Sequence, residues 1–599
     1  MNHQMHIGLD GERLTIQCPF WANDLIRNIP SRRWNKSKRH WVVPMLRKNM
    51  EELLKIKTMP GVAVSEDAAQ AINKYIKASQ SKKTRAMGLP SWYKPMMPPR
   101  KHQQAYFGKR YGLNAFALHA DRGTGKTYCL INVACAMRME GKIDAMLVIV
   151  KLSGRGTWKE NLIGPIMYGD TVYENGIATV PVDLHLPDTN KQREFDKWLR
   201  RPHDFKVMVC GIESMSQGRM KDMARRFLNA TGKVYMVIDE SHLIGTHNSI
   251  RTQEIISLGK LATYRESSTG SPISTGPLNL FSQFEFLDPD IIGIGDFYAY
   301  RNHYAVVLEQ KTKAGKKFPM IVGYKNIDEL TKTVAPYTFE VRKADVLPDL
   351  PPKTYQKSTV QLTAEQRKLY DQIKKTGEYE AGGKTMTPKN VLELALRLHQ
   401  VAGGFVTSYR EEPYIGRGGE GKMRRISVPH AIMPWQQNPK IIDLLDICND
   451  DKQFIIWAAY RSEIQIIVEA LEETFPREKI VQIHGGIVEE ERARFRHLYQ
   501  AGRAKFMVGN TATGGSADTW TACETMVYYN NTERMVDREQ SEDRAHRDGL
   551  KHPVLYIDII AEGTVDVGMM KSVELKIDLS EYIRRNIREA SAILSGAIE

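Results

Sequence analysis

The stretch HADRGTGKTYCL at residues 119–130 constrains the fold more than any other part of this sequence. Two glycines, Gly123 and Gly125, stand just before Lys126 and Thr127. Small residues let backbone N–H groups wrap around a phosphate, the lysine reaches the outer phosphate oxygens, and the threonine hydroxyl suits Mg²⁺. The residues before this loop are strand-like and those after it are helix-like. The stretch therefore predicts the strand–loop–helix unit of a nucleotide-binding α/β domain.

Two residues of this loop are unusual. The full phosphate-loop pattern has a further glycine where this chain has Ala120. Since the strand ends there, a methyl group costs little. Arg122 adds a cation beside a nucleotide that is itself anionic, and we expect it to contact a phosphate or another lobe of the protein.

An acidic pair follows a second strand-like run, residues 234–239. Asp-Glu pairs usually lie on solvated faces, but a pair at the end of an apolar strand is typical of a nucleotide site. Asp239 is predicted to hold Mg²⁺ together with Thr127, and Glu240 to orient and deprotonate the attacking water.

Two arginines supply a candidate cation for the transition state. Arg544 and Arg547, within QSEDRAHR at 540–547, are three residues apart and are predicted to share one helix face. Such arginines stabilise the charge that spreads over a transferring phosphoryl group. Lys126, Asp239, Glu240, Arg544 and Arg547 are thus the candidate catalytic residues, with ATP and Mg²⁺ as the implied cofactors.

The formal net charge is +15, and the excess is uneven. Residues 1–100 contain 18 Lys and Arg against 7 Asp and Glu, a net charge of +11. Such a basic segment predicts polyanion binding. The candidate DNA contacts are Arg32, Arg33, Trp34, Lys36, Lys38 and Arg39. The arginines and lysines can neutralise phosphates, and Trp34 or Trp41 could stack on an unpaired base. That both tryptophans are core residues stays open.

The six cysteines are scattered, without a Cys-x-x-Cys pair, and this is typical of a reducing compartment. We expect no membrane span, because no apolar run of about 18 residues occurs. We expect no signal peptide, because the first residues lack a basic start followed by an apolar run. The expected location is the cytoplasm.

Apolar strand-like runs alternate with helix-like segments in two series, which suits parallel sheets covered on both faces. Residues 280–430 are predicted to be mostly helical and charged. The fold class is therefore α/β, with two parallel-sheet lobes, helical insertions and a small N-terminal α+β domain. The predicted boundaries are 1–80 for the N-terminal domain, 81–96 for a linker, 97–345 for lobe 1, 346–430 for a linker and helical insertion, and 431–599 for lobe 2 with a C-terminal helix.

In their order, the runs HADRGTGKT, VIDESH, STGSP, TATGGSAD and QSEDRAHR resemble the motifs of superfamily 2 ATPases, and more narrowly those of the Swi/Snf-like DNA translocases. PRKHQQAYF resembles the family's Q motif, where Gln103 would read adenine. The resemblance covers roughly residues 97–570 and implies two RecA-like lobes that close on ATP. It implies a nucleotide site made by Gln103, Gly123, Thr124, Gly125, Lys126, Thr127, Gly515 and Gln540.

A shorter resemblance lies in the basic segment. WANDLIRNIPSRRWNKSKRHWVVP, at residues 21–44, resembles the HARP domain of the annealing helicases. It implies a domain that directs the motor to forks or junctions. The absence of a recognisable chromatin-reading or nuclease segment suggests a bacteriophage or prokaryotic source, with the host cytoplasm as the location in the first case and the nucleus only for a eukaryotic protein.

The leading expectation is an ATP-driven translocase on double-stranded or branched DNA, acting without base readout in fork remodelling, strand annealing or branch migration during replication, recombination or repair. Three alternatives remain open. They are a strand-separating DNA or RNA helicase, a translocase that displaces a DNA-bound protein such as RNA polymerase, and a non-catalytic DNA-binding scaffold. The intact candidate catalytic residues argue against the scaffold.

Overall fold

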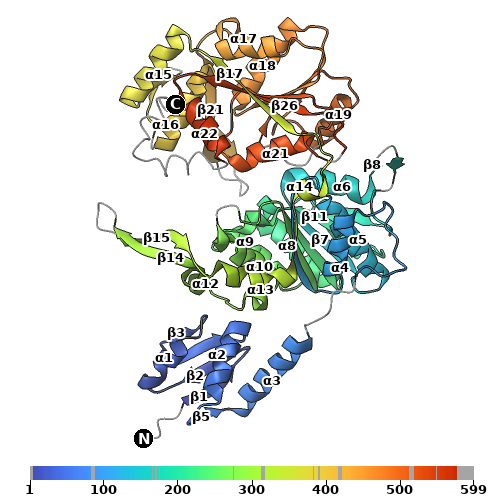
Figure 1. The fold of residues 1–599 in the computed structure, drawn as a ribbon, viewed down its shortest axis with the longest axis vertical. Coiled ribbons are helices and arrows are strands. Elements are labelled where there is room, and N and C mark those ends of the chain that lie inside the picture. The colour runs from blue at the N-terminus through green and yellow to red at the C-terminus, as the bar shows by residue number, and fades with distance from the viewer. Residues whose placement is uncertain are drawn as a thin grey trace. The chain divides into compact units, whose positions relative to one another are not determined.

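Three large β-sheets organise the described part of the chain in this computed structural model (Figure 1). The structure describes residues 5–575 except 82–87, 165, 169–170, 175, 217, 274–275, 312–316, 382, 389–390, 416–420, 512–518 and 548. The chain divides into two units, Met1–Val346 and Leu347–Glu599. Among the described residues, no helix combines the length and the apolar character that a membrane span requires.

The N-terminal domain has a five-stranded sheet in the order β3-β4-β2-β1-β5. The strands are β1 (Met5–Asp10), β2 (Arg13–Gln17), β3 (Arg33–Asn35), β4 (His40–Pro44) and β5 (Val62–Val64). Alternate residues of β1 and β2, such as Ile7, Leu14 and Ile16, are buried. Apolar residues of α1 (Asn23–Arg27), α2 (Arg47–Lys57) and α3 (Glu66–Ser81) complete this core.

The first parallel-sheet lobe has seven strands in the order β10-β11-β7-β12-β13-β6-β16, all parallel. They are β6 (Ala115–Ala120), β7 (Ala145–Val150), β10 (Asp183–His185), β11 (Lys206–Gly211), β12 (Val234–Asp239), β13 (Tyr264–Thr269) and β16 (Thr338–Val341). The strands predicted at 145–150, 206–211 and 234–239 are confirmed residue for residue.

Helices bury both faces of this sheet, which explains the continuous apolar runs. On one face lie α4 (Lys101–Arg110), α5 (Lys126–Met139) and α6 (Arg155–Ile163). On the other lie α7 (Gln192–Arg200), α8 (Gly218–Ala230), α9 (Ile250–Gly259) and α10 (Leu280–Leu287). Within β7, Met146 and Val148 pack with the first set, and Leu147 and Ile149 with the second.

The segment before α4 packs on this lobe. Residues 88–100 form no helix or strand, yet Tyr93 and Met97 are buried in the core beneath α5. The Tyr93 hydroxyl donates to Asn132 Oδ1 at 2.8 Å. Residues 82–87 of the predicted linker lie outside the described residues.

The second unit contains six parallel strands in the order β17-β26-β25-β22-β24-β23. They are β17 (Lys353–Val360), β22 (Phe454–Ala458), β23 (Ile480–Ile483), β24 (Phe506–Asn510), β25 (Thr525–Tyr528) and β26 (Val554–Ala561). Helices α17 (Pro439–Ile447) and α18 (Arg461–Thr474) cover one face, and α19 (Glu489–Gln500) and α21 (Met535–Ala545) the other. The predicted fold class of two parallel-sheet lobes and a small N-terminal α+β domain is confirmed.

A smaller core joins α15 (Ala364–Thr376), α16 (Val391–Ala402) and the start of α22 (Val565–Glu574). The C-terminal part of the predicted final helix, residues 576–599, lies outside the described residues.

The prediction of mostly helix for residues 280–430 is wrong in part, because three antiparallel hairpins form there. They are β14 (Ala305–Lys311) with β15 (Lys317–Tyr324), β18 (Tyr379–Ala381) with β19 (Lys384–Met386), and β20 (Phe405–Ile415) with β21 (Gly421–Ala431). Where a two-stranded ribbon has both faces in solvent, as in the exposed part of β14–β15, it needs no single apolar face, so its residues lack the alternation that predicts a strand. Strands β18 and β19 have only three residues each, too few for a clear pattern. Residues 416–420, between β20 and β21, lie outside the described part of the chain.

Candidate nucleotide site and nucleic-acid surface

The phosphate-binding loop joins β6 to α5, and its backbone depends on glycine. Gly123 and Gly125 have φ values of 81° and 86°, a left-handed conformation that residues with a Cβ rarely adopt. A Cβ on Gly125 would lie 2.4 Å from Nε2 of Gln103. Helix α5 begins at Lys126, so its first N–H groups adjoin this loop. A helix N-terminus of this kind favours a bound anion.

Lys126 lies inside the loop, where its Nζ donates to the carbonyl oxygens of Ala120 at 2.9 Å and Asp121 at 3.3 Å. Ala120 is the last residue of β6, as expected from the strand pattern. Burial lowers the pKa of the Lys126 ammonium, and the carboxylates of Glu240 and Asp239 act in the opposite direction.

The acidic pair lies at the carboxyl end of β12. The Trp158 indole N–H donates to Asp239 Oδ2 at 3.0 Å, and the Glu240 N–H donates to Asp239 Oδ1 at 3.1 Å. Burial raises the pKa of Asp239, the neighbouring Glu240 carboxylate raises it further, and Lys126 opposes both. Only β13 separates β12 from β6 in the parallel sheet. The strand ends therefore bring Lys126, the half-buried Thr127 and the acidic pair to one edge.

Arg122 contacts this acidic pair directly. Its Nε lies 3.6 Å from Glu240 Oε1, and the two side chains are only 10% and 17% exposed. His242 Nδ1 lies 3.3 Å from the other Glu240 oxygen and 3.0 Å from Thr269 Oγ1. Burial alone would raise the pKa of Glu240, but Arg122, His242 and Lys126 hold it well below its usual range. Glu240 also has a φ of 57°, so backbone and partners together orient its carboxylate.

Replacing Arg122 with methionine is expected to lower kcat for ATP about 10-fold or more, with a smaller change in KM, because orientation of a catalytic group acts mainly on kcat. Methionine keeps most of the volume but removes the ion pair to Glu240. ATPase rates over a range of ATP concentrations measure both constants. Arg122→Lys, which keeps the charge, should recover part of kcat. Wild-type kinetics in Arg122→Met would show that the ion pair has no role in turnover.

Gln103, the residue expected to read adenine, is buried against the phosphate-binding loop. Its Oε1 accepts the Arg100 N–H at 2.9 Å, and its Nε2 lies 3.5 Å from the Thr124 carbonyl oxygen. His102 Nε2 lies 2.9 Å from the same oxygen. The structure thus joins the first turn of α4 to the loop; adenine recognition by Gln103 stays a prediction.

Helix α21 of the second unit carries further predicted residues. Gln540 is buried within it. Arg544 lies in its last turn, where the Arg544 carbonyl accepts the Trp520 N–H at 2.9 Å. Their roles in binding and catalysis stay predictions. Gly515 and the rest of the run at 512–518 lie outside the described residues.

The prediction that Arg544 and Arg547 share one helix face is wrong. Helix α21 ends at Ala545, because His546 has a ψ of 74°, outside the helical region. Arg547 therefore lies in the following turn, where its Nη1 donates to Thr519 Oγ1 at 2.7 Å. In the sequence, Thr519 is the residue that follows the run at 512–518.

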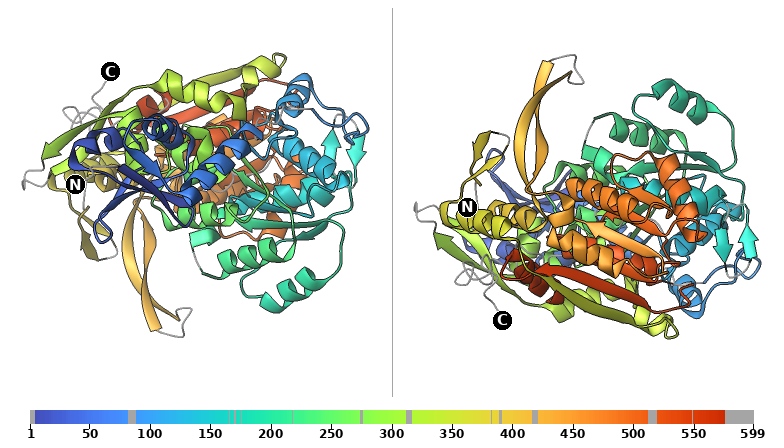
Figure 2. Two further views of the ribbon diagram at one scale, coloured as in Figure 1. Left: turned by 90° about the horizontal axis from the view of Figure 1, so that it is seen from below. Right: turned by 90° about the horizontal axis from the view of Figure 1, so that it is seen from above.

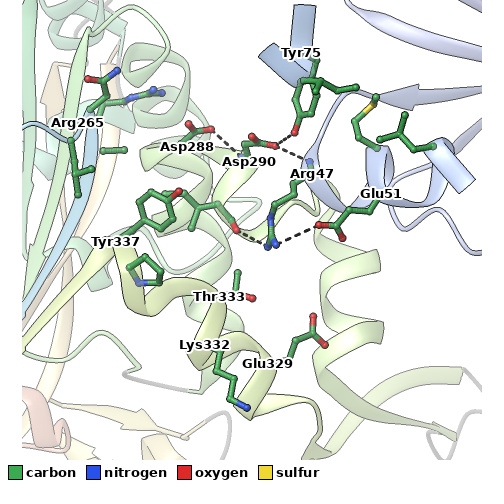
Figure 3. Close-up of a pocket in the computed structure, with 18 of the residues that line it drawn as sticks. Arg47, Glu51, Tyr75, Arg265, Asp288, Asp290, Glu329, Lys332, Thr333 and Tyr337 are labelled. Carbon is green, nitrogen blue, oxygen red and sulfur yellow. Dashed lines mark hydrogen bonds and ion pairs between the residues drawn. The ribbon is translucent and has the colours of Figure 1, made fainter. Parts of the chain in front are cut away.

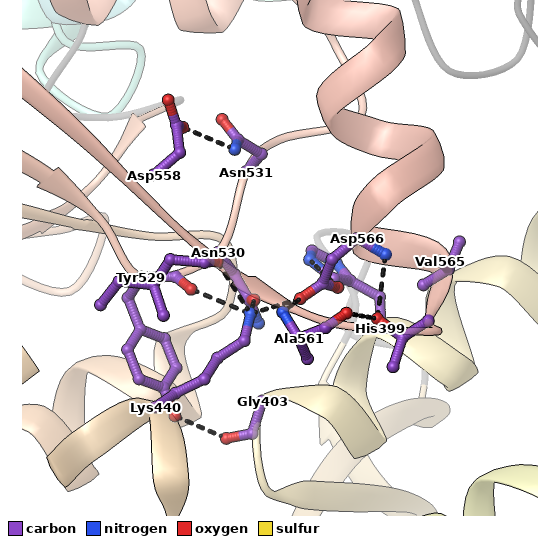
Figure 4. A network of polar contacts seen from close by, with 12 residues as sticks. His399, Gly403, Lys440, Tyr529, Asn530, Asn531, Asp558, Ala561, Val565 and Asp566 are labelled. Atoms are coloured by element: carbon purple, nitrogen blue, oxygen red, sulfur yellow. Dashed lines mark hydrogen bonds and ion pairs between the residues drawn. The ribbon is translucent and has the colours of Figure 1, made fainter. Parts of the chain in front are cut away.

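Buried polar contacts hold α21 in place. Arg538 is fully buried and donates from Nη1 to Asn531 Oδ1 at 2.6 Å, from Nη2 to Asp558 Oδ2 at 3.1 Å and from Nε to Glu542 Oε1 at 2.7 Å. Asp558 belongs to β26, and it also accepts a hydrogen bond from Asn531 (Figure 4). A charge buried this deeply needs all of its partners, so α21 is held firmly to the sheet.

A second buried network lies nearby in the same unit (Figure 4). Lys440 is 1% exposed, and its Nζ lies 2.6 Å from Asp566 Oδ2. It also donates to the carbonyl oxygens of Tyr529 at 3.2 Å and Ile559 at 3.3 Å. Burial lowers the pKa of the adjoining His399 to about 4, so this imidazole is neutral near pH 7. The network ties α17 and the start of α22 to β26 and to the residue after β25.

The predicted DNA contacts lie on the β3–β4 hairpin and the residue before it. Lys36, Lys38 and Arg39 are exposed, and Arg32 is half-buried. Two of the cations pair within the chain, Arg33 with Asp296 at 2.9 Å and Lys38 with Asp10 at 2.8 Å. These exposed pairs contribute little to stability, so a phosphate could replace either carboxylate.

Aromatic side chains lie beside these cations. Trp34 is 46% exposed and contacts the edge of Trp41, with ring centroids 5.1 Å apart. The Trp41 indole donates to Asn23 Oδ1 at 2.9 Å, so Trp41 has a structural role. Sequence reasoning missed Phe20 and Trp21, which are 92% and 63% exposed. Two adjacent large aromatic residues after Pro19 were the available signal.

The N-terminal domain docks on the first lobe through a polar interface (Figure 3). Asp290 in α11 (Pro289–Ile292) accepts the Arg47 N–H at 2.7 Å and the Tyr75 hydroxyl at 2.5 Å. Lys48 pairs with Glu329 of α13 (Ile327–Val334). A pocket of about 710 Å³ lies beside these contacts. These contacts involve charged side chains and backbone groups at several points. The interface therefore holds the N-terminal domain, with its β3–β4 hairpin, in place on the first lobe.

Two family models match the chain: "SNF2-related domain" over residues 112–403 and "Helicase conserved C-terminal domain" over residues 437–549. Together they cover more than half of the sequence. The solved structure titled "Sulfolobus solfataricus SWI2/SNF2 ATPase core in complex with dsDNA" is 18% identical with a TM-score of 0.35, covering 84% of this chain and 96% of that one.

Three curated relatives are similar over long stretches. TATA-binding protein-associated factor MOT1 of Saccharomyces cerevisiae is 23% identical over 569 residues, 82% of this chain and 28% of the relative. DNA annealing helicase and endonuclease ZRANB3 of Homo sapiens is 23% identical over 422 residues, 67% and 36% of the two chains. ATP-dependent helicase fft1 of Schizosaccharomyces pombe is 21% identical over 522 residues, 80% and 52%. This chain thus spans between about a quarter and a half of their length.

The two family models are consistent with the two parallel-sheet lobes. The first model spans the candidate nucleotide site at the edge of the first sheet. The chain belongs to the SNF2-related family of ATPases, of the helicase and translocase type.

Proposed function

We propose that this protein is an ATP-driven translocase that moves on double-stranded or branched DNA. The observation that carries the proposal is the set of residues at one edge of the first parallel sheet, where Lys126, Asp239 and Glu240 meet. The matched helicase C-terminal domain at residues 437–549 would provide the other half of a two-lobe motor.

The donor set fits a magnesium nucleotide. The N–H groups at the start of α5 and the Lys126 ammonium would bind phosphate oxygens. The Thr127 hydroxyl and the Asp239 carboxylate are oxygen ligands of the kind Mg²⁺ prefers. The half-buried Asp239 carboxylate, with its raised pKa, would gain from a cation. Bound Mg²⁺ would neutralise charge on the phosphates.

The remaining residues would act on the attacking water and the transition state. Glu240, oriented by Arg122 and His242, would accept a proton from the water. Arg544 and Arg547 would stabilise charge on the transferring phosphoryl group. Repeated closing and opening of the two lobes would move the protein along the DNA backbone.

The N-terminal domain would recognise DNA structure. Its exposed cations suit phosphates, and the exposed rings of Phe20, Trp21 and Trp34 suit stacking on unpaired bases. Neither interaction reads sequence. Fork remodelling, strand annealing or branch migration in replication, recombination or repair is the role that fits, and ZRANB3 is named as a DNA annealing helicase.

A second candidate function follows from another relative. MOT1 is named as a TATA-binding protein-associated factor. The same motor could act on a DNA-bound protein, displacing it as the translocase moves.

We expect ATP turnover to be stimulated by double-stranded DNA, and more strongly by a fork or four-way junction than by single strands, because phosphate contacts and exposed aromatic rings act together there. ATPase rates on the four DNA forms measure this. Displacement of a triplex-forming strand without unwinding of the duplex would identify translocation. Turnover that no DNA form stimulates would refute the proposal, and release of a DNA-bound protein block without fork conversion would favour the second function.

A further inference from the structure

The hairpin β20–β21 belongs to neither of the matched domains. It spans residues 405–431, whereas the first family model ends at residue 403 and the second begins at residue 437. Both views of Figure 2 show it as a long gold ribbon that projects from the body of the second unit. We refer to its two strands, residues 405–415 and 421–431, as the arm.

The base of the arm is anchored. Phe405 and Val406 are buried, and the Phe405 ring packs on Tyr460 with centroids 5.5 Å apart. The Tyr379 hydroxyl donates to the Thr407 carbonyl oxygen at 2.9 Å. A two-stranded ribbon is only marginally stable in water by itself. These contacts therefore support the arm and set its direction.

Among the described residues, the outer half of the arm carries exposed apolar and charged side chains. Pro413 and Met423 face each other across the two strands, and Met423 is 58% exposed. Behind them on the same face, the Arg425 guanidinium lies 3.6 Å from the centroid of the Tyr409 ring. This stacking holds the arginine in one orientation.

The opposite face is also basic. Glu412 pairs with both Arg410 and Arg424, the second at 3.4 Å, so one carboxylate serves two guanidinium groups. The two strands of the arm contain four Lys or Arg residues and two Glu residues. This excess of positive charge is complementary to a phosphodiester backbone.

Methionine and proline are among the side chains that proteins insert between base steps, where they unstack the bases. A side chain inserted in this way acts as a wedge between the bases. Arginines close behind it would bind phosphates of the two separated strands. We propose that the arm is a DNA wedge, with the Pro413–Met423 pair placed where a duplex divides into two strands and Arg424 and Arg425 on the adjoining phosphates. The proposal rests on the DNA translocase function. It adds the site on the protein at which the two DNA strands separate.

The test compares the full-length wild-type chain with two variants. Met423→Asp puts a negative charge on the wedge. In the second variant, Asn-Gly replaces residues 411–425, forming a two-residue turn between the paired residues Arg410 and Ile426. Ile442→Asp is the matched control, because Ile442 is a 45% exposed apolar residue on α17 of the same unit. Two rates are measured: ATP turnover on a blunt linear duplex, and ATP-dependent conversion of a labelled fork.

We expect turnover on the duplex to stay within about 2-fold of wild type in all variants, while fork conversion falls about 10-fold or more in Met423→Asp and in the shortened arm, because only the junction needs unstacked bases. Ile442→Asp should convert forks at the wild-type rate. Unchanged fork conversion in both arm variants would overturn the wedge and favour a protein as the occupant of the arm. Parallel loss of both rates would also overturn it, since the arm would then be a general DNA clamp. A wild-type chain without DNA-stimulated turnover would instead refute the translocase function itself.

Discussion

Glu240→Gln is expected to lower ATP turnover by roughly 10²–10⁴-fold, the usual contribution of a positioned general base. Glutamine keeps the size of the side chain, but it cannot accept the proton of the attacking water. Because the change lies at the nucleotide edge of the first sheet, DNA binding should remain within about 2-fold of wild type. DNA-stimulated ATPase rates and fluorescence anisotropy with labelled duplex measure the two quantities.

Two further variants sharpen this expectation. Lys126→Ala should also abolish turnover, and it should weaken ATP binding as well, because the ammonium is the phosphate contact. Glu194→Gln, an exposed carboxylate on α7, is the matched control and should behave as wild type. Turnover that persists in both Glu240→Gln and Lys126→Ala would show that the nucleotide site is elsewhere.

Arg544→Ala is expected to lower kcat by roughly 10³–10⁵-fold, the range for an arginine that stabilises the transferring phosphoryl group, with little change in ATP affinity. The reason is that such an arginine meets its full partner charge only in the transition state. Steady-state kinetics and equilibrium binding of a slowly hydrolysed nucleotide separate the two effects.

Arg534→Ala is the matched control for Arg544→Ala. Arg534 precedes the first residue of the same helix, α21, and its side chain is 57% exposed. It should retain wild-type turnover. Equal losses of kcat and affinity in Arg544→Ala would indicate a contact already made in the ground state. Turnover matching that of Arg534→Ala would exclude Arg544 from the chemistry.

Several strands of the two parallel sheets, among them β7, β11 and β12, were predictable because their signal is local. A parallel strand covered on both faces is apolar at every position, and residues 145–150 and 234–239 show this without interruption. The phosphate-binding loop was predictable for the same reason, since the φ values of Gly123 and Gly125 are requirements of that short loop alone.

Other features had weak or misleading local signals. The spacing of Arg544 and Arg547 suits a helix, but α21 ends between them. The arm alternates charged and apolar residues irregularly, because both of its faces meet solvent beyond the base. Phe20 and Trp21 would ordinarily be core residues by composition, and only the fold shows them exposed.

The sequence by itself determined the two parallel-sheet lobes, the nucleotide loop and the acidic pair, because strand burial and loop conformation depend on residues close together in the chain. The tertiary structure alone decided which partners distant side chains meet. Arg122 lies beside Glu240, and Arg47 and Tyr75 meet at Asp290. Each of these contacts joins residues more than 100 positions apart. It forms only when the packed helices and strands bring opposite charges, or a donor and an acceptor, within reach of each other.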